Sequence, residues 1–223
     1  MFVFAKGYIC CGCARRFSAA KSFAVYKTSC ICTECYQKLP HMSKRSFMEG
    51  TKETSMLMAP FEYDGLYRDI FLKFKFGGDY ALGHIIGMAA AQYFKDIELK
   101  DQYDIIVPVP LSKERMNQRG YNQTEIITDY IADTIGLPVD KPLVREKHCV
   151  AQSKLWGMER VKNVIGAFAV NADLTGRRVI LTDDIFTTGS TVNECARVMK
   201  EAGAKEICVI CAAKTNIKKN ICF

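Results

Sequence analysis

The stretch VILTDDIFTTGSTVNECARVM, residues 179–199, joins a short apolar run, two adjacent acids, a row of small and hydroxylated residues, and a helical pattern. The apolar run at 179–181 predicts a buried strand, so Asp183 and Asp184 fall at its carboxyl end. The pattern from 192 to 202 predicts a helix that ends at Gly203. Ligands of parallel α/β sheets bind at this edge. The stretch therefore predicts a ligand site between the strand and the helix.

The residues between the acids and the helix suit a phosphate. Small hydroxylated side chains, the positive end of the helix and a glycine that permits close approach all favour an anion; the residues are Thr187, Thr188, Gly189, Ser190 and Thr191. The acids would repel that anion, so we expect them to face hydroxyl donors or a divalent cation. A phosphorylated sugar has both a phosphate for the loop and vicinal hydroxyls for the acids. The stretch is neither a Walker loop nor a G-x-G-x-x-G loop, and a helix-capping turn beside incidental acids is the alternative.

Strand and helix patterns alternate from residue 56 onward. We expect further strands near 56–63, 104–110, 166–170 and 206–212, and helices at 66–76, 79–94 and 124–135. Apolar strands that alternate with helices indicate an α/β domain around a mainly parallel sheet. We assign residues 56–223 to this domain, 1–40 to a small cysteine-rich module, and the polar segment 41–55 to a linker.

The composition is that of a globular protein, with most of the net charge near the N-terminus. The 223 residues are 49% hydrophobic and 25% charged, which is typical of folded chains. The longest apolar run, 207–213, is too short to cross a bilayer, and the start MFVFAKG lacks a signal-peptide pattern. We therefore expect a cytoplasmic protein with no membrane insertion. Residues 1–58 hold nine Lys or Arg against three acids, which indicates either a basic binding face or a solvated surface.

Six of the eleven cysteines lie between Cys10 and Cys35. Two CxxC pairs separated by eighteen residues supply four candidate ligands, Cys10, Cys13, Cys32 and Cys35. Facing pairs of this kind can form a sulfur tetrahedron, which suits Zn²⁺. A forty-residue module has little core of its own, so we expect one structural zinc ion. Cys11 and Cys30 leave the choice of ligands open, and free thiols in a flexible tail are the alternative.

The stretch at 179–199 resembles the phosphoribosyl pyrophosphate (PRPP) motif of type I phosphoribosyltransferases, in which an apolar strand and two acids precede T-T-G-[ST]-T. In that family the acid pair holds the ribose 2′ and 3′ hydroxyls and the loop holds the 5′-phosphate. The resemblance therefore implies that Asp183 and Asp184 hold the ribose, that the loop 187–191 holds the phosphate, and that Mg²⁺ accompanies PRPP.

Other motifs narrow the resemblance. The paired CxxC knuckles, LKFKFGGD at 72–79, VPVPLSKERMNQRGYNQTE at 107–125 and RVKNVIGAF at 160–168 together resemble the ComF family. Members of this family are phosphoribosyltransferase-like proteins associated with competence for DNA uptake. The resemblance implies a type I phosphoribosyltransferase-like parallel sheet flanked by helices, with a small N-terminal zinc module that has four cysteine ligands. Thr182 stands where the family more often has Val, and Cys149 where a Thr commonly precedes the Gln that is here Gln152.

The loop that follows the strand at 104–110 matches the place where type I enzymes hold pyrophosphate, often with a strained backbone. The resemblance implies that Leu111 and Ser112 contribute to PRPP binding there. Lys113, Arg115 and Arg119 are suited to neutralise the charge that builds on the leaving group, together with Mg²⁺. A solvated basic loop is the alternative. The sequence specifies neither a general base nor an acceptor pocket, so it supports PRPP binding more firmly than catalysis.

Aromatic residues within basic stretches predict contact with single-stranded DNA. Tyr121 and Trp156 can stack on exposed bases, and the neighbouring cations can follow the phosphates; those cations are Lys147, Lys154, Arg160 and Lys162. The alternative places both aromatics in the core. We therefore expect a PRPP-binding protein of DNA uptake, with single-stranded DNA and other uptake proteins such as a helicase as partners. A metabolic phosphoribosyltransferase acting on a small base or amine is the competing hypothesis.

Overall fold

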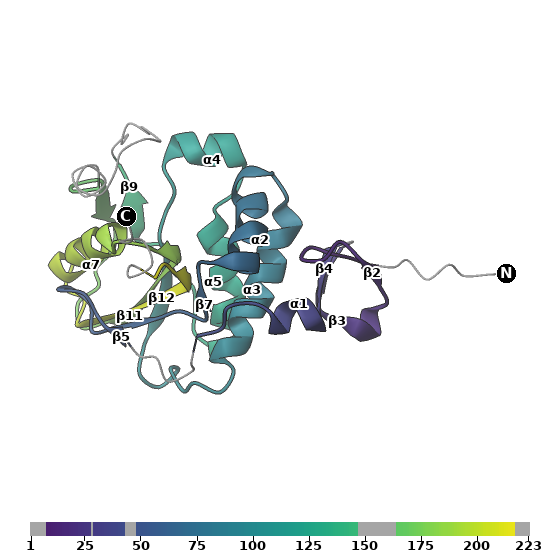
Figure 1. The fold of residues 1–223 in the computed structure, drawn as a ribbon. Helices are drawn as coiled ribbons and strands as arrows, with labels where there is room; N and C mark the ends of the chain where they lie inside the picture. The colour runs from purple at the N-terminus through teal and green to yellow at the C-terminus, as the bar shows by residue number, and fades with distance from the viewer. Residues whose placement is uncertain (1–7, 28, 43–47, 147–163, 217–223) are drawn as a thin grey trace, which may run out of the picture.

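The computed structural model describes residues 8–27, 29–42, 48–146 and 164–216. A small N-terminal module stands beside a larger α/β domain (Figure 1). The module holds four strands in the order β2-β1-β4-β3 and a short helix, α1 (Thr33–Gln37). Its strands are β1 (Tyr8–Cys10), β2 (Arg16–Phe17), β3 (Ser22–Tyr26) and β4 (Ser29–Cys32), and a 3-10 turn covers Ala19–Lys21.

The larger domain is built on a sheet in the order β5-β6-β12-β11-β8, which confirms the mainly parallel sheet. These strands are β5 (Met48–Glu49), β6 (Met56–Met58), β12 (Glu206–Lys214), β11 (Arg178–Phe186) and β8 (Ile105–Pro108). β7 (Phe61–Glu62) also pairs with β12, and within this sheet, as far as the structure describes it, only β5 runs antiparallel to its neighbour. The central strands are buried on both faces, as their continuous apolar sequences require.

Helices cover both faces of this sheet (Figure 1). One face packs against α2 (Gly65–Phe76), α3 (Tyr80–Phe94) and α5 (Gln123–Ile135), and the other against α7 (Ser190–Glu201). The period of two along β12 divides its side chains between the faces: Ile210 joins the first core and Val209 the second. The predicted helices are confirmed, and their ends follow the sequence: Asp64 caps α2, and Gly136 ends α5 at φ 79°.

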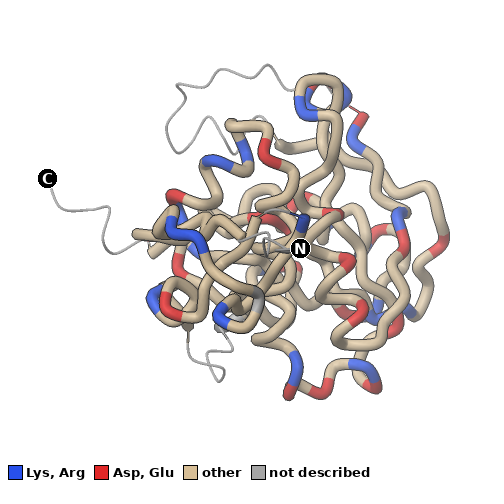
Figure 2. The backbone as a smooth tube through the Cα atoms, turned by 90° about the vertical axis from the view of Figure 1, so that its right-hand side faces the viewer, with Lys and Arg blue, Asp and Glu red and all other residues tan. Residues whose placement is uncertain are grey.

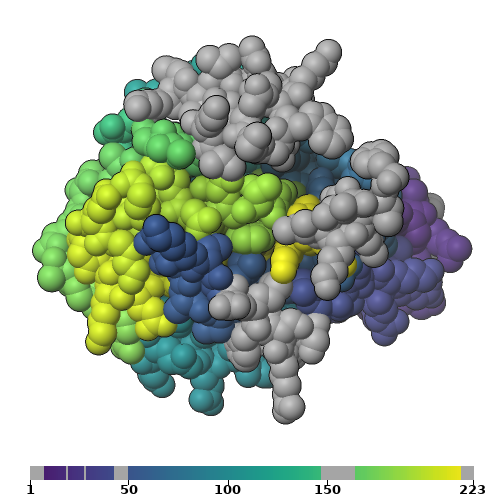
Figure 3. Space-filling view, turned by 60° about the vertical axis from the view of Figure 1, so that its left-hand side comes forward, coloured from purple at the N-terminus to yellow at the C-terminus, as the bar shows by residue number. Residues whose placement is uncertain are grey.

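Three features differ from the simplest expectation. β5 lies within the segment assigned to a linker and pairs with β6, and the Ser55 N–H donates to the carbonyl of Ile207. Figure 3 shows this part of the chain, in dark blue, lying against the yellow C-terminal residues. The strand expected at 166–170 is β10 (Phe168–Val170), which pairs with β9 (Leu143–Arg145) in a separate antiparallel sheet. A short helix, α4 (Lys113–Arg119), follows β8.

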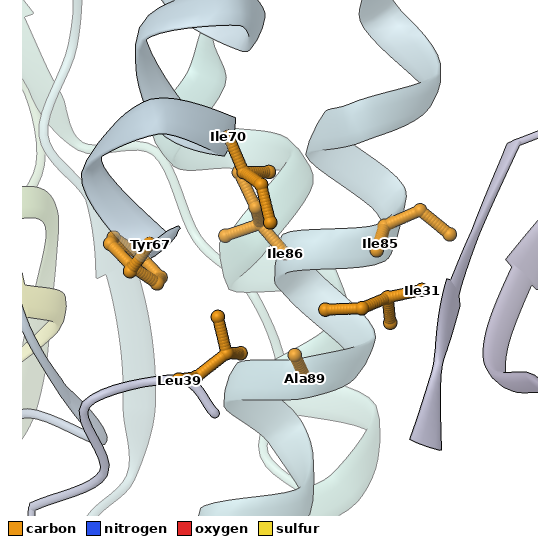
Figure 4. A pocket seen from close by; sticks show the side chains of 7 residues that line it. All are labelled: Ile31, Leu39, Tyr67, Ile70, Ile85, Ile86 and Ala89. Carbon is orange, nitrogen blue, oxygen red and sulfur yellow. The ribbon is translucent and has the colours of Figure 1, made fainter. Parts of the chain in front are cut away.

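The module packs against α2 and α3. The ring of Tyr26 stacks on that of His84 with centroids 3.6 Å apart. Nearby, Ile31 and Leu39 face the two helices across an apolar cavity of about 10 Å³ (Figure 4). This volume is about that of one water-sized sphere, so the cavity is too small for an organic ligand. Among the helices of the described ranges, none combines the length and apolarity needed to span a membrane.

Candidate functional site

The acid pair lies where two central strands part. β11 pairs with β8 only as far as Thr182, opposite Pro108, whereas its pairing with β12 continues to Phe186. Asp183 and Asp184 therefore lie within β11 and not beyond its end, and they sit beside the opening that β8 leaves. Such an opening at the carboxyl edge of a parallel sheet is where ligands of this fold class bind.

Alternation along β11 sends the two carboxylates to different faces of the sheet. The side chains of Ile180, Thr182 and Asp184 face α2 and α5. On that face, Asp184 Oδ2 accepts a hydrogen bond from Lys75 Nζ at 3.0 Å. The side chains of this ion pair are 22% exposed for Lys75 and 16% for Asp184. Asp183 instead accepts from the Asp184 N–H at 2.8 Å. Among the described residues, one acid is thus neutralised by a lysine at contact distance and the other is not.

The electrostatics of Asp183 follow from this arrangement. Burial, and then the neighbouring charge of Asp184, raise the pKa of Asp183 to about 7, while Lys75 and Arg145 act in the opposite direction. Arg145 comes from β9, its guanidinium lies 5.1 Å from the ring of Phe168, and its buried Nε has no hydrogen-bond partner among the described residues. Neither cation was among the site residues predicted from the sequence. Lys75 belongs to the quoted LKFKFGGD motif, whereas no local pattern marks Arg145.

The loop after β11 leads into α7 through a left-handed glycine. Gly189 is the N-cap at φ 77°, and no side chain of the described residues caps α7 there. A Cβ at this position would lie 2.8 Å from the ring of Phe186, so only glycine fits without a shift. The Thr188 and Ser190 hydroxyls are 2.8 Å apart. Uncapped N–H groups beside hydroxyls, at the positive end of a twelve-residue helix, are groups that can bind an anion.

The loop after β8 is fixed beside the acid pair. The Val109 N–H donates to the carbonyl of Thr182 at 2.9 Å, and Asn122 Nδ2 donates to the carbonyl of Val109 at 3.1 Å. Ser112 is buried and caps α4 by accepting from the Arg115 N–H at 3.3 Å, while Leu111 is half-buried. The strained backbone that the resemblance suggests is not seen as a positive φ at 109–113, since among described non-glycine residues only Ala14 and Lys27 have one.

The three predicted cations lie on α4. Lys113 and Arg115 are exposed, and Arg119 is half-buried, with one guanidinium N–H donating to Gln123 Oε1 at 2.9 Å. Burial, then the charge of Arg115, lower the pKa of Arg119, and the charge of Asp184 opposes this shift. Arg119 therefore interacts with the charge of Asp184 across the site.

The predicted zinc ligands come together in the module. The sulfurs of Cys10, Cys13, Cys32 and Cys35 all lie within 4.8 Å of one another. Zinc–sulfur bonds of about 2.3 Å place tetrahedral sulfurs about 3.8 Å apart, so this cluster fits a metal ion and its soft donors suit zinc. Backbone N–H groups of the second pair point at sulfurs, each at 3.4 Å. The alternative ligands, Cys11 and Cys30, lie outside the cluster among the described residues.

The family model for the phosphoribosyl transferase domain matches residues 81–220. The chain belongs to this family. Competence protein F of Haemophilus influenzae is 28% identical over 217 residues, which cover 91% of this chain and 89% of that protein. Competence protein ComFC of Bacillus subtilis is 31% identical over 143 residues, covering 64% of this chain and 57% of its own. DNA utilization protein YhgH of Escherichia coli is 33% identical over 113 residues, half of each chain. With these relatives, the chain is a ComF family, phosphoribosyltransferase-like protein.

Solved structures include similar chains. The glutamine PRPP amidotransferase of B. subtilis is 20% identical, with 58% of this chain and 26% of that chain covered and a TM-score of 0.39. A purine phosphoribosyltransferase of Pyrococcus horikoshii is 20% identical, with 59% and 73% covered and a TM-score of 0.36. These scores are too low to establish a shared fold alone, so membership in the phosphoribosyl transferase family rests on the sequence match.

The matched region of this phosphoribosyltransferase-like chain begins after Lys75 and after the four clustered cysteines. It includes Tyr121, whose ring stacks on Phe74 with centroids 5.7 Å apart and whose hydroxyl donates to the Phe74 carbonyl at 3.1 Å. These contacts favour the structural alternative for Tyr121. The remaining nucleic-acid candidates, Lys147, Lys154, Trp156, Arg160 and Lys162, lie outside the described residues.

Proposed function

We propose that this phosphoribosyltransferase-like protein binds PRPP with Mg²⁺ at the edge of β11 and acts in DNA uptake, where it contacts single-stranded DNA. The observation that carries the proposal is the acid pair at the parting of β8 and β11, next to the uncapped N-terminus of α7. An anion site and two adjacent carboxylates suit a ligand with a phosphate and vicinal hydroxyls.

Each part of PRPP has candidate partners in this arrangement. The N–H groups and hydroxyls of residues 187–191 would receive the 5′-phosphate, and Asp183 and Asp184 would accept hydrogen bonds from the ribose hydroxyls. The diphosphate would lie toward the loop after β8, where Arg119 and the other α4 cations balance its charge. Mg²⁺ would neutralise the diphosphate oxygens when bound. Lys75 already holds Asp184 at 3.0 Å, so it would orient that carboxylate or yield it to the ligand.

The role in DNA uptake is supported by the relatives, two of which are named competence proteins and one a DNA utilization protein. The positive charge of the module, with Arg15 and Arg16 exposed, and the cations of α4 would supply contacts to phosphates. We propose Zn²⁺ as the metal of the cysteine cluster, where it would hold this basic module in shape.

Calorimetric titration with PRPP tests the small-molecule half of the proposal. We expect saturable binding that strengthens with Mg²⁺. Absence of binding with Mg²⁺ present would refute it. A turnover assay with PRPP and candidate bases separates the competing metabolic hypothesis, because sustained pyrophosphate release with one base would favour a metabolic transferase.

A titration with a single-stranded oligonucleotide tests the other half. We expect affinity to fall with salt, with a slope of roughly −0.7 per phosphate contact. Neutralising Arg15 and Arg16 by alanine should make that slope shallower if the module contributes. An intact protein that shows no binding at low salt would refute the DNA contact and leave the metabolic hypothesis in its place.

A further inference from the structure

Three exposed apolar side chains lie at the end of α2, at the start of α3 and on α4. Phe76 is 73% exposed, Tyr80 39% and Met116 36%. These are three of the five large hydrophobic side chains that are exposed in the described ranges. A single exposed hydrophobic residue needs no explanation, but several exposed aromatic and apolar residues on neighbouring elements favour an interaction site. Phe76 is the most exposed of them, and it follows directly after Lys75 of the acid-pair site.

The cluster stands on a packed aromatic base. Tyr121 stacks on the buried Phe74, and the ring of Tyr80 meets Tyr121 edge-on with centroids 5.2 Å apart. The Arg119 guanidinium lies 5.8 Å from the centre of the Phe76 ring. Since Gln123 also holds Arg119, the cation is fixed near this exposed ring. Phe76 is thus an exposed aromatic side chain that lies beside the guanidinium of Arg119.

Positive charge surrounds the same place. Segments 72–80 and 111–121 hold five cations, Lys73, Lys75, Lys113, Arg115 and Arg119, against two acids, Asp79 and Glu114. Lys75 is paired with Asp184, so four of the cations contribute positive charge to this surface. The carboxylate of Asp79 accepts from the Ala81 N–H at 3.1 Å, which caps α3. Figure 2 shows the Lys and Arg positions of α4, in blue, at the top of the molecule. The surface is therefore both aromatic and cationic.

We infer that the surface formed by Phe76, Met116 and the α4 cations is the contact site for single-stranded DNA, with a base stacked on Phe76. The inference rests on the proposed DNA contact and names its location. Single strands have unpaired bases, which can stack on an aromatic ring, and regularly spaced phosphates, which can contact cations. The exposed Lys113 and Arg115 then face the phosphates of the strand, whereas the half-buried Arg119 supports the Phe76 ring beside the proposed diphosphate site.

The openness of the site favours a polymer over a free base or nucleotide. A small-molecule pocket covers most of its ligand, whereas Phe76 is 73% exposed and stands at the end of a helix. A duplex would hide its base faces by stacking. Phe76 therefore replaces Tyr121 as the expected stacking residue, because Tyr121 is already stacked within the protein.

The test compares two fluorescent strands of equal length, one an oligothymidylate and the other abasic, binding to the full zinc-loaded chain. By fluorescence anisotropy, Phe76→Ala should weaken binding of the oligothymidylate by about tenfold, within the range for loss of one base–aromatic stack. It should leave both the salt slope and the affinity for the abasic strand unchanged. The Phe76→Trp variant, which keeps an aromatic ring, should bind the oligothymidylate with the affinity of the wild type. Arg115→Ala should instead make the salt slope shallower by about 0.7 on both strands.

Lys95→Ala is the matched control, since Lys95 is exposed at the opposite end of α3. It should match the wild type on both strands. Equal affinity of Phe76→Ala and wild type for the oligothymidylate would overturn the inference while leaving the proposed DNA contact intact. An equal loss on the abasic strand would also overturn it. A PRPP titration completes the test: loss of PRPP binding in Phe76→Ala would overturn the inference by assigning the residue to the small-molecule site.

Discussion

Replacing Asp183 with Asn should make the folded protein less sensitive to rising pH. The Asp183 side chain lies on the α7 face of the sheet, next to the carboxylate of Asp184, and burial there disfavours its charged form. Lys75 forms its ion pair with Asp184 and not with Asp183. Ionisation of Asp183 therefore has a higher free-energy cost in the folded chain than in the unfolded chain. The Asn side chain keeps the size and the acceptor oxygen for the Asp184 N–H but carries no charge.

The magnitude follows from the two pKa values of Asp183. The folded pKa is about 7, against an ordinary value of 3.8. Between these values the folded state retains a proton that the unfolded state has lost, so the stability of the wild type falls as pH rises. A tenfold difference in proton affinity between the two states corresponds to about 1.4 kcal/mol, which sets a ceiling of about 4 kcal/mol. Between pH 5 and pH 8 the wild type should lose about 2 to 3 kcal/mol relative to Asp183→Asn.

Thermal unfolding at pH 5 and pH 8, without PRPP or added Mg²⁺, measures this difference. For a chain of this size the relative shift should be about 5 to 10 °C in favour of Asp183→Asn at pH 8. Asp69→Asn is the control, because Asp69 is an exposed residue of α2, and its unfolding temperature should follow that of the wild type. The wild type and Asp183→Asn would move in parallel only if Asp183 ionised at no cost. Parallel pH dependence of these two proteins would therefore refute the reasoning.

Three further predictions concern the metal, the ligand and the sheet. Metal analysis should give one zinc per chain, retained in Cys11→Ser and Cys30→Ser, and a metal-free chain that stays folded would contradict this. By calorimetry, Asp184→Ala and Thr188→Ala should each weaken PRPP binding by roughly tenfold to a hundredfold without unfolding the domain; unchanged affinity in both would place the ligand elsewhere. In denaturant unfolding, Thr182→Val and Thr128→Val should each cost about 1 kcal/mol, because their buried hydroxyls lie 2.6 Å apart. The double variant should cost less than the sum, and strict additivity would show that the pair does not interact.

The helices and central strands could be predicted well from the sequence because local signals and burial agree there. A capping aspartate marks the start of α2, an apolar face marks its extent, and the glycines after it mark its end. The acid pair, the loop 187–191 and the cysteine cluster could be located because each lies within one or two short motifs. β10 was predicted as a strand, but its partner β9 was not predicted, because an apolar run indicates a strand without indicating which strand pairs with it.

The cations around the acid pair depend on long-range packing. Lys75 and Asp184 are 109 residues apart, and they meet because α2 packs on the face of the sheet toward which the Asp184 side chain points. Thr182 shows the same dependence. Where the family more often has Val, this chain buries a hydroxyl, and the hydroxyl of Thr128 on α5 is its partner. The sequence shows the departure at 182 but not the residue that compensates for it.

The surroundings of Asp183 and Asp184 reduce the repulsion expected between these two carboxylates and a phosphate bound at the proposed loop site. From the sequence alone, Asp183 and Asp184 place two negative charges beside the loop that should receive a phosphate. In the folded chain, Lys75 neutralises Asp184, and the raised pKa of Asp183 keeps that carboxyl largely protonated below about pH 7. The site without ligand therefore carries far less negative charge than its sequence suggests, and a phosphate can approach α7 without strong repulsion. Hydroxyl donors or a cation at the acid pair would then favour the ionised form of Asp183. The proposed ligand thus supplies the groups that make the second charge tolerable, which couples binding at the acid pair to binding at the loop.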